Sequence, residues 1–320
     1  MKTNLLMFIV ILLILFTVPF IGKPWQNNEQ SSPKENVTTT DICPVEITVE
    51  GVKEPVALEE YVKGVVSAEM PVTFHLEALK AQALAARTYA LKRTNYGQQP
   101  IAKDVSAQVF NVLEERQKKW GAQFQEYEKK VEQAVKETEG KVVLYDNELI
   151  TAMFFAASNG KTETAKNFSG SDIPYLQSVE SVGEEQVTKN YKEQKSIALA
   201  EWNALLGVDW DEESFQSLQL IRNHTGRVQS LIATNYEQNG RAIREKLGLR
   251  STDFNIAFDV TNEQVLIETV GYGHGVGMSQ YGAEVLAQQG KTAEQIIAHY
   301  YKDTIIEKFE NPQQTCLKTP

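Results

Sequence analysis

The sequence predicts an α+β fold, in which helices and strands are mixed without a regular alternation. Some segments repeat apolar residues with the period of an amphipathic helix, and others alternate apolar and polar residues as half-buried strands do. The two kinds do not follow the strand–helix–strand order of a parallel α/β protein, and no internal repeat is present. We expect one folded unit. One arrangement open to this unit has two lobes that form a groove.

Residues 1–23 are expected to form a transmembrane anchor. No charge lies between Lys2 and Lys23, and the apolar run approaches the roughly 20 residues that span a bilayer core. A cleaved signal peptide is the alternative, but it would have a shorter apolar core and small residues at its cleavage site. Val18, Phe20 and Ile21 are bulky, which favours an uncleaved anchor with the rest of the chain exported.

Residues 24–41 are polar and contain Pro, Ser, Asn and Thr, so they are expected to form a flexible linker. The folded domain then covers residues 42–320. Cys43 and Cys316 lie near its two ends, where an oxidising compartment would allow a disulfide between the domain termini. Two unrelated thiols are the alternative, because spacing alone does not determine connectivity.

The first half of the domain is expected to be mainly helical. A strand over 45–50 precedes helices over 58–68, 74–93 and 123–137. The first helix ends at Met70 and Pro71, because the residue before a proline avoids helical angles. Two strands follow, over 141–146 and 148–155, with Asp146 and Asn147 as their hairpin turn.

The second half begins with a charged, less regular stretch over 183–227, which contains a helix near 196–206. Strands are predicted over 217–222, 228–234, 255–258 and 264–269. Two final helices cover 280–288 and 292–300, each with a Ser or Thr as its N-cap candidate.

Composition excludes several classes of function. The chain has 32 basic and 42 acidic residues and a formal charge of -10, so it is a poor binder of polyanions such as nucleic acid. Its four His residues are scattered, and no HExxH or paired CxxC motif is present, so a metal site is not expected. The absence of G-x-S-x-G argues against a serine hydrolase. Gly160-Lys-Thr and Gly290-Lys-Thr end like phosphate-binding loops, but Phe155 and Val285 replace the first glycine.

Glu69 is the most informative candidate for chemistry. It lies eleven residues after Leu58, on the helical stripe that also contains Val62 and Val65, where the pattern calls for an apolar residue. The carboxyl end of a helix disfavours negative charge by at most about 1 kcal/mol when exposed. A general acid at neutral pH therefore needs burial to raise its pKa further. A carboxylate that pairs with a cation or reaches solvent is the alternative.

Two further side chains have open interpretations. Arg87 lies at the edge of the apolar face of the second helix, where an ion-paired arginine is common, and contact with Glu69 would lower the pKa of that carboxyl. His274 lies in the glycine-rich segment 271–277, which matches no dinucleotide-binding pattern and predicts a loop whose backbone approaches another group closely. This histidine either donates to a substrate or faces the core.

Four motifs together resemble the stage II sporulation protein D family. In chain order they are SAEMP at 67–71, ALKAQALAARTY at 78–89, ASNGKT at 157–162 and GHGVGMSQYGA at 273–283. The resemblance covers most of residues 42–310 and includes the N-terminal anchor, and four separated motifs in the same order make it specific. It implies a membrane-anchored lytic transglycosylase that cuts the MurNAc–GlcNAc linkage of denuded glycan without water and leaves a 1,6-anhydro-MurNAc end. The setting would be septal peptidoglycan remodelling and engulfment during sporulation.

The resemblance also implies roles for individual residues. Glu69 matches the catalytic acid of the family, and Arg87 is expected to position the substrate or hold the groove. A hydrolase usually needs two carboxylates, whereas here the C6 hydroxyl of the sugar attacks and one carboxyl serves as acid and then base. The remaining candidates for binding sugars are Ser158, Asn159, His274, Ser279, Gln280 and Tyr281.

One departure from the family concerns metal. Some relatives are similar to each other in carrying Cys and His ligands for zinc in the loop after the second helix, but residues 101–117 contain neither. We therefore expect no zinc and no other cofactor, with packing holding this loop instead.

The resemblance implies the partners SpoIIM, a membrane scaffold, and SpoIIP, an amidase-endopeptidase, at the sporulation septum, with the catalytic domain extracytoplasmic. A non-catalytic amidase enhancer or wall-binding module is the alternative function, because the same domain resembles that of amidase enhancers. The apolar setting of Glu69 and the absence of long N-terminal wall-binding repeats favour the enzyme. A purely structural septal scaffold leaves that setting unexplained.

Overall fold

The computed structural model describes residues 45–309. The anchor expected over 1–23, the linker over 24–41 and the Cys43–Cys316 pair lie outside these residues. Within residues 45–309, none of the helices combines the length and the apolar character that crossing a membrane requires. This part of the chain mixes helices with short, mostly antiparallel strands, which confirms the α+β class.

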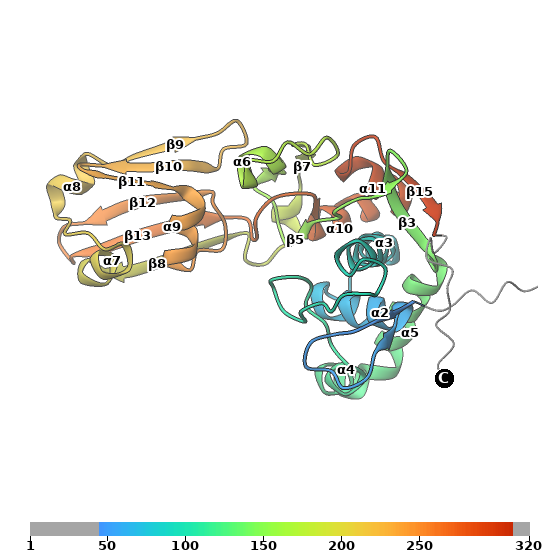
Figure 1. Cartoon of the computed structure of the whole chain (residues 1–320). Coiled ribbons are helices and arrows are strands. Elements are labelled where there is room, and N and C mark those ends of the chain that lie inside the picture. The colour runs from blue at the N-terminus through green and yellow to red at the C-terminus, as the bar shows by residue number, and fades with distance from the viewer. Residues whose placement is uncertain (1–44, 310–320) are drawn as a thin grey trace, which may run out of the picture. The chain divides into compact units, whose positions relative to one another are not determined.

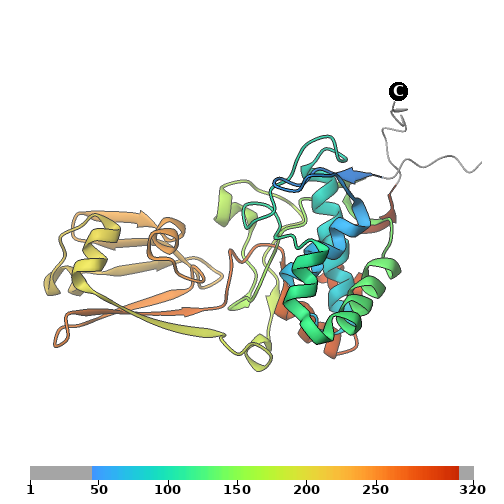
Figure 2. The ribbon, with the colours of Figure 1, turned by 90° about the horizontal axis from the view of Figure 1, so that it is seen from below.

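Two separate hydrophobic cores organise the described residues. The first collects side chains from 47–179 and 276–301, and the second from 197–267. The second core is thus built by an insertion into the chain of the first, and we call the two parts the helical lobe and the strand lobe. Figure 1 and Figure 2 both show the yellow and orange elements of the strand lobe grouped apart from the blue and green helices. A groove between the lobes stays a prediction.

Helix α3 (Leu76–Arg93) is the centre of the helical lobe. It packs against α2 (Leu58–Glu69), α5 (Phe124–Glu137), α10 (Gln280–Gln288) and α11 (Ala293–Tyr300) (Figure 1). Many of its buried positions are alanines, and these small side chains let the neighbouring helices approach closely on several sides.

Proline and cap chemistry sets several helix boundaries where the sequence predicts them. Met70, the residue before Pro71, is extended, with φ -114° and ψ 143°, so α2 ends at Glu69. The side chains of Ser279 and Thr292 accept backbone N–H groups from the first turns of α10 and α11 and cap both helices.

The strands of the helical lobe are short. Asp146 and Asn147 have φ values of 49° and 63°, which a two-residue hairpin turn requires, so the predicted turn is confirmed. The single strand predicted over 148–155 is wrong, because its two ends pair in different sheets. The elements are β1 (Glu46–Ile47) with β2 (Val56–Ala57); β3 (Lys141–Tyr145) between β4 (Glu148–Leu149) and β15 (Ile305–Lys308); β5 (Phe154–Phe155) parallel to β14 (Met278–Ser279); β6 (Gly160–Lys161) with β7 (Glu180–Ser181); and the short helices α6 (Ala165–Ser169) and η3 (Glu184–Gln186).

Helix α4 (Leu113–Trp120), followed by η2 (Gly121–Gln123), was not predicted, and the loop expected over 101–117 ends at 112. Its polar sequence shows no helical apolar period. Arg116 is 1% exposed, and its Nη2 pairs with Glu60 Oε1 at 2.6 Å on α2 and with Glu128 Oε1 at 2.8 Å on α5. The ion pairs of Arg116, together with the packing of Trp120 against Phe124 and Tyr127 in the first core, therefore hold this helix.

The strand lobe contains two antiparallel sheets, ordered β9-β10-β11 and β12-β13-β8. The helix predicted over 196–206 begins only at Leu199, because Ser196 to Ala198 pair with β13. The elements are β8 (Lys192–Ala198), α7 (Leu199–Leu206), α8 (Glu212–Gln216), β9 (Gln219–Arg222), β10 (Val228–Ala233), β11 (Tyr236–Asn239), α9 (Gly240–Leu247), β12 (Phe254–Asp259) and β13 (Gln264–Val270).

Candidate active site

Glu69 is the last residue of α2, and its side chain is partly buried. The backbone N–H of Val109 donates to Glu69 Oε1 at 2.7 Å. The Gln280 amide also hydrogen-bonds this carboxyl, and Lys119 on α4 lies close enough to act on its charge. The loop 101–112, α4 and α10 therefore meet at the carboxyl end of α2.

The surroundings of Glu69 favour its acid form. Burial is the largest effect and raises the pKa of the carboxyl, whereas Val109 N–H, the Gln280 amide and Lys119 lower it, and the net direction is upward. Among residues 45–309, no second carboxyl group shifts the pKa of Glu69. Glu69 is thus a single carboxyl group that keeps its proton to higher pH than an exposed glutamate, as a general acid must.

Close packing holds the loop 101–112 over α2. The Phe110 ring stacks on Tyr61 with centroids 5.2 Å apart, and Asn111 N–H donates to Gly64 O at 3.3 Å. A Cβ atom at Gly64 would lie 2.2 Å from the Phe110 ring, so only glycine leaves room for this approach. In the described part of the chain, no three His, Cys, Asp or Glu side chains are grouped to hold a metal ion.

Arg87 lies far from Glu69. Its side chain is 0% exposed and forms a bidentate pair with Glu59, with Nε–Oε1 at 2.8 Å and Nη2–Oε2 at 2.6 Å. Nη1 also donates to the carbonyl of Lys141 at 3.1 Å. Glu59 and Glu69 lie near opposite ends of α2, about 15 Å apart along its axis. Arg87 thus ties α3 to α2 and β3, and it neither lowers the pKa of Glu69 nor offers exposed surface to a sugar.

Ser158 and Ser279 converge on a buried carboxyl that the sequence analysis missed, Glu184. Ser158 donates its N–H to Oε2 at 2.8 Å and its hydroxyl to Oε1 at 2.7 Å, and the Ser279 hydroxyl donates to Oε2 at 2.8 Å. The Ser181 hydroxyl donates to Oε1 at 2.6 Å. All four residues are buried, so the two serines expected to bind sugars face inward in this structure.

Asn159 joins the two lobes. Its Nδ2 donates to Thr225 O at 3.0 Å and to Asp253 Oδ2 at 2.9 Å, both in the strand lobe. Glu163 makes a second such contact, because its Oε2 accepts from Asn223 Nδ2 at 2.6 Å. Residues 159–163 therefore supply contacts between the lobes, and the amide nitrogen of Asn159 is held by partners within the protein.

Both ring nitrogens of His274 have partners inside the protein. Val276 N–H donates to Nδ1 at 3.0 Å, so Nε2 carries the proton and donates to Phe154 O at 3.0 Å. Burial lowers the pKa of His274 to about 4, which makes the ring neutral at pH 7. Of the two interpretations of this histidine, the inward-facing one matches its contacts.

Gln280 is the predicted sugar-binding residue that the structure brings to Glu69. It is 4% exposed, and its Nε2 donates to Gln82 Oε1 at 3.3 Å. Tyr281 is partly buried and packs edge-on against Phe74, with centroids 5.0 Å apart. Gln280 therefore links the start of α10 to both α3 and Glu69.

Three neighbours of this site were missed from the sequence. Val109 acts through its backbone N–H, which leaves no side-chain signal. Lys119 donates to Ser67 O at 2.7 Å from a helix that was not predicted. Gln82 is 0% exposed within the motif 78–89, where a polar residue among alanines was the available signal.

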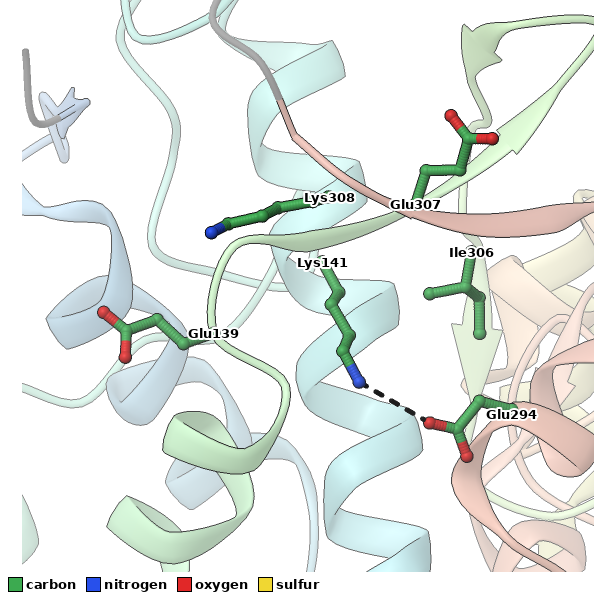
Figure 3. Close-up of a pocket in the computed structure, with 6 residues that line it drawn as sticks. All are labelled: Glu139, Lys141, Glu294, Ile306, Glu307 and Lys308. Carbon is green, nitrogen blue, oxygen red and sulfur yellow. Dashed lines mark ion pairs between the residues drawn. The ribbon is translucent and has the colours of Figure 1, made fainter. Parts of the chain in front are cut away.

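A shallow pocket elsewhere in the helical lobe is lined by Glu139, Lys141, Glu294, Ile306, Glu307 and Lys308 (Figure 3). Lys141 Nζ lies 3.8 Å from Glu294 Oε1 across it. The neighbouring Gly140 donates its N–H to Glu59 at 3.2 Å, near the start of α2. The pocket is thus at the opposite end of α2 from Glu69, and its mixed charges indicate a solvated surface.

Comparisons with known proteins identify the family. A family model described as SpoIID, stage II sporulation protein, matches residues 48–145. Stage II sporulation protein D of Bacillus subtilis is 37% identical over 323 residues, which cover 93% of this chain and 93% of that protein. The Bacillus amyloliquefaciens protein of the same name is 40% identical over 265 residues, or 81% of this chain and 76% of that protein. The amidase enhancer of Bacillus subtilis is 26% identical over 300 residues, or 77% of this chain and 40% of that protein. The chain belongs to the SpoIID family of stage II sporulation proteins.

Proposed function

We propose that this chain is a lytic transglycosylase that cleaves the MurNAc–GlcNAc bonds of denuded peptidoglycan glycan and leaves 1,6-anhydro-MurNAc ends. The observation that carries the proposal is Glu69, a partly buried carboxyl whose pKa is raised and on which, among the described residues, no second carboxyl acts. A glycoside hydrolase usually uses two carboxyl groups, about 5–10 Å apart. A lytic transglycosylase needs only one.

The reaction moves one proton in each direction. Protonated Glu69 donates to the bridging O4 of GlcNAc as the bond between MurNAc C1 and that oxygen breaks. The C6 hydroxyl of the same MurNAc bonds to C1, and the Glu69 carboxylate takes the hydroxyl proton. No water is consumed, and the enzyme returns to its acid form. Burial favours the acid before the first step, and Val109 N–H, Gln280 and Lys119 stabilise the carboxylate between the two steps.

The same proposal includes the cellular setting. Residues 1–23 would anchor the chain, residues 24–41 would act as the linker, and residues 42–320 would work outside the membrane at the sporulation septum. SpoIIM would serve as scaffold, and SpoIIP would strip stem peptides before this enzyme cuts the glycan. The similarity to stage II sporulation protein D over 93% of the chain supports this setting.

A non-catalytic role is the second candidate. The similarity to an amidase enhancer over 77% of the chain favours it. Such a module would accelerate a partner amidase and would leave glycan strands intact on its own.

The two functions give different products. The full-length chain, purified in detergent, is expected to shorten denuded glycan with no amidase present, and mass spectrometry should find 1,6-anhydro-MurNAc ends. Intact glycan, together with faster peptide release when an amidase is added, would support the enhancer role instead. Shortened glycan that carries only reducing ends would identify a hydrolase.

A further inference from the structure

Glu184 is a fully buried carboxyl that the proposed reaction does not use. It is 0% exposed, and its hydrogen bonds come from neutral donors on Ser158, Ser181 and Ser279, at 2.6 to 2.8 Å. These donors lie on three segments that are distant in the sequence. Glu184 therefore joins the ASNGKT motif, β7 and the start of α10 at one point.

The start of α10 rests directly on this cluster. The Ser279 hydroxyl donates to Glu184 and accepts Gly282 N–H at 3.2 Å, which makes it the N-cap of α10. A Cβ atom at Gly282 would lie 2.0 Å from Tyr300 Oη, 2.3 Å from Ser181 Oγ and 2.9 Å from Glu184 Oε1. Only glycine leaves room for this approach, so the start of α10 lies in direct contact with the cluster.

The start of α10 also carries the amide that faces Glu69. Gln280 follows Ser279 directly, and its side chain bonds both Gln82 Oε1, at 3.3 Å, and the Glu69 carboxyl. We propose that Glu184 is a positioning residue for Glu69, because its bond to Ser279 keeps the Gln280 amide on the Glu69 carboxyl. This inference rests on the proposed function of Glu69.

Loss of the Gln280 contact is expected to raise the pKa of Glu69. The Gln280 amide stabilises the carboxylate of Glu69, so its loss raises the pKa of that carboxyl further. The other titratable groups around Glu69 are Lys119 on α4 and Tyr61 on α2, and Tyr89 on α3 acts on Tyr61. The acid form of Glu69 then persists to higher pH, and the basic limb of the activity profile moves upward.

Glu184→Gln in the full-length chain tests the inference on denuded glycan. We expect the basic limb of kcat to move up by about one pH unit, with a lower maximal kcat and a KM within about twofold of the wild type. Gln280→Met is expected to move the limb in the same direction. In the double variant Glu184→Gln should add no further movement, because its effect passes through Gln280.

Glu163→Gln is the matched control, because Glu163 is also buried, at 4% exposed, but bonds Asn223 and Thr225 between the lobes. Its basic limb should stay at the wild-type pH. If Glu184→Gln does not fold, Ser279→Ala removes one hydroxyl of the same connection and is expected to move the limb upward. An unmoved limb in whichever of these two variants folds overturns the inference.

The failure of this inference is distinguishable from failure of the proposed function. Glu69→Gln that still cleaves glycan at the normal rate would reject both. Glu69→Gln without activity, together with a wild-type profile for folded Glu184→Gln, would reject only the positioning role.

Discussion

Glu69→Gln is expected to abolish glycan cleavage and leave the fold intact. The amide is nearly isosteric with the carboxyl and its oxygen can still accept Val109 N–H, which donates at 2.7 Å in the wild type. It has no proton to deliver to the bridging oxygen. Because positioned acid–base groups contribute about 10²–10⁴-fold to rates, the release of anhydro ends should fall by at least about a hundredfold.

The control for this variant is Glu114→Gln, which removes an exposed carboxyl on the neighbouring α4 and should cleave glycan at the wild-type rate. Urea unfolding checks both folds.

The folded-state pKa of Glu69 is raised, so the stability that its protonated form contributes is fully present below the unfolded pKa and is lost as pH rises through the folded value. The free energy of unfolding of Glu69→Gln should therefore change less with pH than that of the wild type between the unfolded and folded pKa values of Glu69. A normal cleavage rate in this variant would contradict the account.

Arg87→Met is expected to destabilise the protein strongly and to leave substrate affinity unchanged. Removing one partner of a buried ion pair costs about 3–5 kcal/mol. The Glu59 side chain is 30% exposed and can reach solvent, so we expect the lower end of that range. The carbonyl of Lys141 loses a donor as well. The shift of the urea midpoint measures the effect.

Arg93→Met is the matched control for Arg87. Arg93 is exposed in the last turn of the same helix, so its loss should change stability by no more than about 0.5 kcal/mol. The KM of folded Arg87→Met on denuded glycan should equal that of wild type. An unchanged urea midpoint with a raised KM would instead place the guanidinium on the substrate.

Local chemistry made much of the fold predictable. Pro71 ends α2, Ser279 and Thr292 begin α10 and α11, and Asp146 with Asn147 form a hairpin turn, as each residue type favours. These boundaries depend on the chain within a few residues of each position. Sequence alone is sufficient for such features.

Elements that depend on distant partners were missed. Helix α4 is mostly polar, and one of its two buried residues, Arg116, is stabilised by Glu60 and Glu128 on two other helices. The first residues of the helix predicted over 196–206 are strand, because β13 pairs with them. The local sequence pattern of each segment does not show the distant residues that pair with it.

The candidate site divides in the same way. Glu69 was recognisable as a carboxyl on an apolar stripe, and the structure brings Gln280 to it. The direction in which Ser158 and Ser279 point depends on Glu184, which nothing in its own segment distinguished. The sequence motifs thus indicated which segments lie close together. Only the packed structure showed which of their side chains face inward.

The central claim is that a hydroxyl of the sugar, and not water, completes the cleavage that Glu69 begins. Digestion of denuded glycan by the full-length chain in H₂¹⁸O tests it directly, with mass spectrometry of the new ends. The account predicts ends that are lighter than reducing ends by one water and contain no ¹⁸O. Reducing ends that carry ¹⁸O would contradict it.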